Sequence, residues 1–193
     1  METREESLSH LEEYARIPIA FEVSRILDLS LLDGGIGGLE LLERPVTPTF
    51  VKDYDGIPGN RPTDWARRFD LSNWGLLSAR LEGEWVGGAA IALKTRGLLM
   101  LEDRSDLAVV WDLRVSPHAR RRDVGAALFA ATEQWAAGRG CRRLKVETQN
   151  INVPACRLYA SRGCTLGAIH RFAYPDLPEE VQLLWYKNLG DHA

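Results

Sequence analysis

The alternation of hydrophobic and polar residues predicts several strands in the middle of this chain. Residues 74–81 and 85–93 are two apolar runs, and the polar residues 82–84 between them form a short turn sequence. Two apolar runs joined in this way predict a β-hairpin. Residues 107–115 form a nearly continuous apolar run, which is typical of a strand in the middle of a sheet.

The most regular hydrophobic repeat predicts a helix over residues 125–139. Its buried face is expected to carry the side chains that recur at helical spacing: Leu128, Phe129, Thr132, Trp135 and Ala136. Glycines at positions 138 and 140 end the pattern. Beyond it we expect a strand at 144–148, a helix at 152–162, and strands at 164–174 and 181–187.

The first half of the chain carries weaker patterns. Residues 1–16 are rich in glutamate, and we expect a frayed helix or a loose, flexible segment there. Aliphatic and β-branched residues at 17–32 predict a strand that leads into a helix, and the glycines within 34–38 predict a turn. The remaining expected elements are a strand at 39–45, a short helix at 65–69 capped by Thr63 and Asp64, and a short strand at 98–101.

The order of these elements predicts one mixed sheet with helices on its faces, an α/β or α+β arrangement. A chain of 193 residues is long enough to enclose one sizeable core, so we expect residues 1–193 to form a single domain.

Composition narrows the possible partners. With 45% hydrophobic and 26% charged residues, this is an ordinary globular composition. No apolar run approaches the ~20 residues that span a bilayer, and the polar N-terminus does not resemble a signal peptide. The net charge of −3 argues against nucleic acid, in spite of a basic turn at 120–122. Three cysteines without metal-ligand spacing indicate reduced thiols in the cytoplasm and no metal site.

The run from Val115 to Phe129 carries the clearest chemical signal. It combines the end of a strand, a turn with Arg120, Arg121 and Arg122, and the opening of the predicted helix. The first turn of a helix has unpaired N–H donors and the positive end of the helix dipole, which favour phosphate. An acidic protein with one basic turn is therefore suited to a compact anionic ligand.

This run resembles the first motif of the GCN5-related N-acetyltransferases, the GNAT family. Arg122, Gly125 and Ala127 fit its acyl-CoA-binding signature Arg/Gln-x-x-Gly-x-Gly/Ala. The family's second motif is similar to residues 147–164, where its positions correspond to Asn152, Ala155, Leu158, Tyr159 and Gly163. Residues 40–48 and 112–115 carry a closer resemblance, to the streptothricin acetyltransferase type.

The resemblance implies the α/β (α+β) acetyltransferase-like fold. That fold has a central mixed, mostly antiparallel and splayed sheet of about seven strands, with helices on both faces. It further implies that residues 17–105 build the acceptor side and residues 106–193 the acyl-CoA-binding half.

The resemblance also implies acetyl-CoA as the acyl donor. Backbone N–H groups of residues 121–127 would hold its pyrophosphate, and its pantetheine arm would lie like an added strand against residues 111–115. The cofactor-binding residues expected in this way are Leu113, Arg114, Val115, Arg120, Arg121, Arg122, Asp123, Val124, Gly125, Ala126, Ala127, Asn152, Ala155 and Tyr159.

Two positions depart from the family's pattern. Relatives usually carry glycine where this chain has Arg121 and Asp123, and glycine adopts φ angles that these residues resist. The Asp123 carboxylate would also repel a phosphate. Either Asp123 caps the helix and points outward, or the chain binds CoA weakly or uses another acyl donor.

Candidate catalytic residues follow from the resemblance and from buried charge. Tyr159 matches the tyrosine that donates a proton to the CoA sulfur in the family; a phenol is protonated at neutral pH and can serve as the acid. The alternative is an aromatic side chain packed on its helix. Glu147 and Asp112 are carboxylates in apolar strands, where partial burial suits a base or an amine-orienting group.

Each carboxylate also has a structural interpretation. Asp112 would pair with Arg114, and Glu147 with Lys145, since each partner lies two residues along the same strand face. A water chain to solvent would replace a dedicated base.

The expected activity is transfer of an acetyl group from acetyl-CoA directly to a primary amine of a small cationic acceptor. His170 and Trp185 are candidate acceptor contacts, although a polar strand tip and core packing are the alternatives. The other functions considered are a protein or peptide N-acetyltransferase and a non-catalytic CoA-binding regulatory module. Analogy with the family suggests a homodimer.

Overall fold

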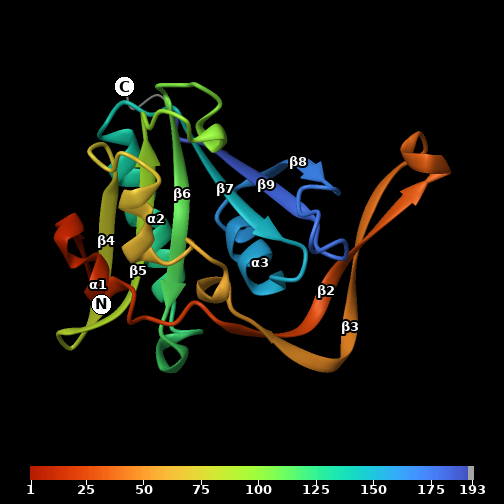
Figure 1. Cartoon of the computed structure of the whole chain (residues 1–193), viewed down its shortest axis with the longest axis horizontal. Coiled ribbons are helices and arrows are strands. Elements are labelled where there is room, and N and C mark those ends of the chain that lie inside the picture. The colour runs from red at the N-terminus through yellow and green to blue at the C-terminus, as the bar shows by residue number, and fades with distance from the viewer. Residues whose placement is uncertain (191–193) are drawn as a thin grey trace. The chain divides into compact units, whose positions relative to one another are not determined.

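The computed structural model, which describes residues 1–190, has one large and one small sheet (Figure 1). Its strands and α-helices are β1 (Glu2–Glu6), α1 (Leu11–Tyr14), β2 (Phe21–Leu32), β3 (Gly38–Lys52), β4 (Gly75–Leu81), β5 (Glu84–Leu93), β6 (Leu107–Val115), α2 (Val124–Ala137), β7 (Arg143–Gln149), α3 (Val153–Ser161), β8 (Thr165–His170) and β9 (Gln182–Asn188). Seven strands form a sheet in the order β1-β4-β5-β6-β7-β9-β8, and β2 pairs with β3. The expected mixed sheet is confirmed.

The chain folds into two compact units. Unit 1 comprises residues 1–20, 53–146 and the segment from residue 186 onward, and unit 2 comprises residues 21–52 and 147–185. None of the helices in the described part of the chain is both long and apolar enough to cross a membrane.

The sheet of unit 1 follows the hydrophobic pattern closely. The predicted hairpin is β4 and β5, which pair antiparallel, and the apolar run at 107–115 is β6, the fourth of the seven strands. β6 pairs antiparallel with β5 and parallel with β7, where Leu107 lies opposite Arg143. Its central place explains why its apolar run is nearly unbroken.

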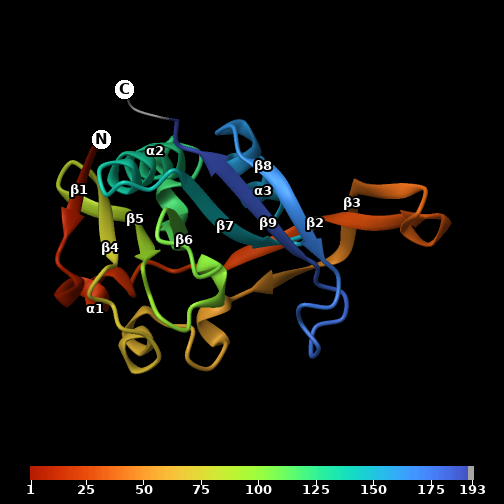
Figure 2. The ribbon, with the colours of Figure 1, turned by 90° about the horizontal axis from the view of Figure 1, so that it is seen from above.

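Helices cover both faces of this sheet in unit 1 (Figure 2). A Cβ atom added at Gly87 of β5 would meet Val124 and Leu128 of α2. One added at the next residue, Gly88, would meet the ring of Tyr14 in α1. Because neighbouring strand residues point to opposite faces, α1 and α2 lie on opposite sides of β5. The five residues predicted for the buried face of α2 are all buried.

Unit 2 contains the long β2–β3 hairpin, the end of β7, the helix α3, and β8 with most of β9. The hairpin is longer than expected, because β3 continues from Gly38 to Lys52. The predicted strand at 17–32 does not lead into a helix; it ends at Leu32, and the glycine-rich turn returns the chain directly into β3.

Two further expectations for residues 1–101 are wrong. Residues 1–16 do not form a helix or a loose segment throughout: Glu2–Glu6 form β1, which pairs antiparallel with β4. β1 lies at the sheet edge, where charged residues are accommodated without apolar alternation, so no pattern marked it. Residues 98–101 form a 3₁₀ turn in place of a strand. The short helix expected at 65–69 is present as a 3₁₀ helix at Pro62–Arg67, although its N-cap residue is Arg61 and not Thr63 or Asp64.

Candidate functional site

The turn between β6 and α2 contains two residues with left-handed backbone conformation. Arg121 has φ +60° and Asp123 has φ +59°, so both occupy the left-handed region, which glycine adopts most readily. The left-handed Asp123 is followed directly by the right-handed helix at Val124. This alternation turns successive N–H groups toward one point, and the unpaired donors of the first helical turn lie beside them. The loop geometry is therefore retained without glycine.

The side chains of this turn differ in what they contact. Asp123 occupies the N-cap position of α2, but its carboxylate makes no capping hydrogen bond and is exposed, so the expected side-chain cap is absent. Arg121 and Arg122 are also exposed. Arg120 is half-buried and donates to the carbonyl oxygens of Val115 at 3.1 Å and Ala20 at 2.7 Å. Burial lowers its pKa. Arg120 thus shapes the turn, while its two neighbours project charge into solvent.

Arg121→Gly is expected to raise the free energy of unfolding by up to about 1.5 kcal/mol. The left-handed conformation costs arginine about 1–2 kcal/mol, whereas the extra freedom of glycine in the unfolded chain costs about 0.5–1 kcal/mol. The matched control is Arg122→Gly, which removes the same charge at a position without positive φ and should lower stability by about 0.5–1 kcal/mol. Urea denaturation of both variants measures the difference, and equal changes would contradict backbone strain at Arg121.

Asp112 and Arg114 form a buried ion pair on one face of β6. The Arg114 side chain is fully buried and donates to Asp112 through Nε at 2.9 Å and Nη2 at 2.7 Å. Its remaining contacts are Asp55 at 3.0 Å and the carbonyl oxygen of Ile17 at 3.0 Å. Burial alone would lower the pKa of Arg114, but the hydrogen bonds and charge of Asp112 outweigh it and raise the pKa.

Tyr14 completes this cluster. Its hydroxyl group donates to Asp112, and burial together with the charge of Asp112 raises the Tyr14 pKa well above its usual value. The Asp112 carboxylate therefore has cationic and neutral donors around it. These contacts match the Asp112–Arg114 ion pair that was the alternative to a catalytic role for Asp112, and they occupy the Arg114 side chain.

Glu147 has a different environment, within unit 2. It accepts hydrogen bonds from the Tyr174 hydroxyl at 2.5 Å, the Gln182 amide at 2.8 Å and the Gln149 amide at 3.2 Å. The expected pair with Lys145 is wrong, because that ammonium group binds Glu102 at 2.8 Å. Within residues 1–190, the half-buried Glu147 carboxylate has three neutral donors and no ion pair.

The second motif forms α3 as expected. Asn152 is the N-cap residue of this helix, and its side-chain oxygen accepts from the Ala155 N–H at 3.2 Å. Tyr159 is 5% exposed on the buried face of the helix, next to Cys156 on the preceding turn. The motif's asparagine therefore has a clear local purpose, since it fixes where the tyrosine-bearing helix begins.

The two candidate acceptor contacts lie in unlike surroundings. His170 is exposed at the end of β8. Trp185 is 8% exposed, and its indole N–H donates to the Thr148 hydroxyl at 2.8 Å. Thr148 and Glu147 are neighbours on β7 and so point to opposite faces. The geometry of Trp185 matches the packing alternative.

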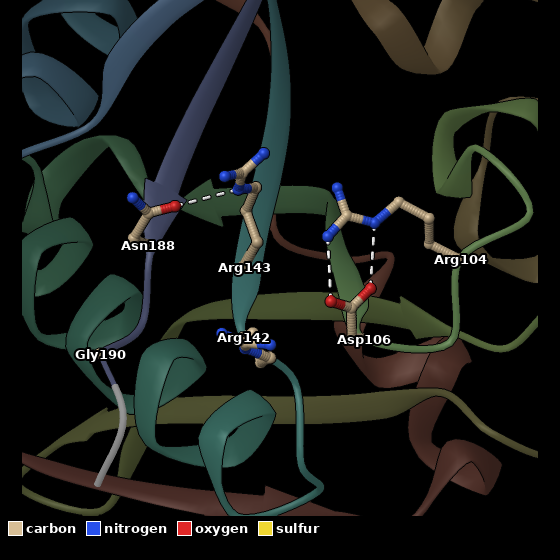
Figure 3. A pocket seen from close by; sticks show the side chains of 6 residues that line it. All are labelled: Arg104, Asp106, Arg142, Arg143, Asn188 and Gly190. Carbon is tan, nitrogen blue, oxygen red and sulfur yellow. Dashed lines mark hydrogen bonds and ion pairs between the residues drawn. The ribbon is translucent and has the colours of Figure 1, made fainter.

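Sequence patterns did not single out two groups of polar residues. Tyr174 and Gln182 hold Glu147 from segments 27 and 35 residues away, and no local signal marks such partners. A cavity of about 410 Å³ in unit 1 is lined by Arg104, Asp106, Arg142, Arg143, Asn188 and Gly190, none of them a predicted site residue (Figure 3). Over the described residues, no group of three or more potential ligands is arranged for a metal ion.

Comparison with known proteins shows which family has both motifs. Residues 41–164 match the Acetyltransferase (GNAT) family. Streptothricin acetyltransferase from Escherichia coli is 39% identical over 169 residues, which cover 86% of this chain and 84% of that protein.

Solved structures agree with this match. The structure of nourseothricin acetyltransferase superposes with a TM-score of 0.74 at 21% identity and covers 98% of each chain. A Bacillus anthracis structure, assigned as a streptothricin acetyltransferase in complex with acetyl coenzyme A, has a TM-score of 0.74 at 25% identity. It covers 97% of this chain and 98% of its own.

Proposed function

The chain belongs to the GNAT acetyltransferase family, and from this membership we propose that its acceptor is a small cationic amine like those of its streptothricin-type relatives. The protein is an acetyl-CoA-dependent N-acetyltransferase. The finer proposal concerns which amine it takes and which side chains act on it.

The proposed acyl-donor site begins at the β6–α2 turn. A pyrophosphate carries delocalised negative charge and accepts several hydrogen bonds, which suits the N–H groups of residues 121–126 and the exposed Arg122. The Ala127 N–H already donates to the Asp123 carbonyl oxygen at 3.0 Å. Leu113 and Val115 would contribute backbone groups to the pantetheine arm, while the Arg114 side chain serves the buried ion pair.

Glu147 carries the proposal of a cationic acceptor. Its carboxylate has neutral hydrogen-bond donors and no cationic partner within the described chain. An ammonium group would add a charge-assisted hydrogen bond to it. The three donors also hold the carboxylate in one orientation, which positions the amine for attack.

The proposed reaction begins when the acceptor ammonium group loses one proton toward Glu147, and its neutral nitrogen then attacks the thioester carbonyl carbon. The C–S bond breaks as the N–C bond is completed, and the leaving thiolate takes a proton from Tyr159. The nitrogen loses its second proton to solvent, and solvent returns a proton to the Tyr159 oxygen. We assign Asp112 to the buried pair with Arg114 and not to this chemistry.

Glu147→Gln tests the assignment. Loss of one charge-assisted hydrogen bond is expected to raise the KM for a cationic amine by about 10-fold to 100-fold, with the KM for acetyl-CoA within about twofold. Steady-state thiol release with streptothricin, an alkylamine and a peptide N-terminus as acceptors provides the measurement. The control is Glu40→Gln, an exposed carboxylate of the hairpin. An unchanged amine KM, or a preference for the peptide, would contradict the proposal.

A further inference from the structure

A second cavity lies within unit 2, among the β2–β3 hairpin, the turn after β7 and the segment between β8 and β9. Its volume is about 220 Å³. The walls from the hairpin are apolar, with Ile26 and Leu29 from β2 and Val46 and Phe50 from β3. This cavity contains none of the residues assigned to the reaction.

Asn150 builds the floor of this cavity. Its backbone accepts from Leu27 N–H at 2.9 Å and donates to the Val181 carbonyl oxygen at 3.0 Å. Its side chain donates to the Leu27 carbonyl oxygen at 3.0 Å and accepts from Val181 N–H at 2.8 Å. Asn150 is 3% exposed, so one buried amide residue joins the hairpin to the start of β9 by four hydrogen bonds. The cavity is therefore preformed.

Charged side chains stand at its rim. Asp28 and Glu179 contribute carboxylates, and Arg171 contributes one guanidinium group. Asp28 pairs with Arg44 at 2.7 Å in an exposed contact, which costs little to exchange for another cation. Glu179 makes no hydrogen bond or ion pair within the part of the chain that the structure describes. Apolar walls below two carboxylates suit an ammonium group on an alkyl chain.

We propose that this cavity is a second recognition site for the acceptor and takes a distal ammonium group of a di- or polycationic amine. This inference rests on the proposed function of Glu147. Asn150 follows Glu147 by three residues, so at most about 11 Å separates the Cα atom of Glu147 from that of Asn150, which lines the cavity. An acceptor that spans them would present one amine at Glu147 and a second at Asp28 and Glu179.

The test compares alkane diamines of increasing length with monoamines of equal carbon number. The variant is Asp28→Asn combined with Glu179→Gln, two exposed isosteric changes, and the control is Glu40→Gln. We expect the variant to raise the KM for the longer diamines about tenfold, as for the loss of two exposed ion pairs. The KM for monoamines and for acetyl-CoA should stay within about twofold. Equal effects on monoamines and diamines, or no effect on either, would overturn the proposal.

Calorimetric titration with the same amines, without acetyl-CoA, separates this inference from the proposed function. If no amine is acetylated, the proposed acceptor class fails, but the cavity is still tested. A diamine that binds the wild-type protein about tenfold more tightly than the double variant supports the second site. Equal binding to both proteins, or no binding of any diamine to the wild type, overturns it. Thermal unfolding of each variant shows that the fold is intact.

Discussion

Replacing Tyr159 by phenylalanine is expected to lower kcat by about 100-fold while the Kd for acetyl-CoA stays within about twofold, since a positioned general acid contributes about 10²–10⁴-fold. The phenol oxygen is the only atom removed, and the ring that fills its buried place on α3 remains. The loss should therefore fall on departure of the thiolate and not on binding. Stopped-flow turnover at saturating substrates, with calorimetry for acetyl-CoA, measures both quantities.

The matched control is Tyr186→Phe. That hydroxyl group donates to Glu102 at 2.7 Å in unit 1 and lies outside both family motifs, so kcat should change by less than about twofold. Weak acetyl-CoA binding with normal turnover at saturation in the Tyr159 variant would contradict the acid assignment and favour a packing role. Comparable losses in both variants would point to a general effect on the fold.

Replacing Arg114 by methionine is expected to lower the free energy of unfolding by about 3–5 kcal/mol. Removing one partner of a buried ion pair leaves an uncompensated charge, and here Asp112 and Asp55 both lose their cation. Methionine fills much of the vacated volume. The loss in the free energy of unfolding therefore comes mainly from the unpaired carboxylates and less from a cavity. Urea denaturation measures it.

Arg104→Met is the control, and its free energy of unfolding is measured in the same way. Arg104 also binds a carboxylate through two nitrogens, with Asp106 at 2.9 and 3.0 Å, but both side chains are about one-third exposed (Figure 3). An exposed pair contributes about 0–1 kcal/mol. Asp112→Asn added to the Arg114 variant should restore part of the loss. The proposal that Asp112 needs the Arg114 cation would be contradicted by either of two results. One is an equal loss in the free energy of unfolding for the two arginine variants, and the other is no recovery of stability when Asp112→Asn is added.

Local pattern was sufficient for part of the fold. The β4–β5 hairpin, β6 and α2 were predicted because their apolar periodicity is set by neighbouring residues along the chain. β1 was missed because an edge strand needs no apolar alternation, and its five residues are held by hydrogen bonds to β4.

In the candidate site, too, the sequence predicted some contacts correctly and others wrongly. The Asp112–Arg114 pair was predicted as an alternative because both residues lie on one strand face, two positions apart. The pair of Glu147 with Lys145 rested on the same spacing and is wrong. The Lys145 ammonium group binds Glu102 instead, which lies 43 residues away in the chain. Spacing shows which partners are possible, and the long-range packing of the chain selects among them.

The sequence by itself determined the family, the acetyl-CoA-dependent chemistry and the positions of both motifs, because these depend on residue type at fixed spacing. Tertiary structure decided that Arg121 and Asp123 adopt the conformation usually left to glycine, because the surrounding turn and helix hold their backbone there. It also decided the partners of Glu147 and the cavity around Asn150. Both are assembled from segments far apart in sequence, whose encounter depends on burial of the whole core and leaves no local pattern.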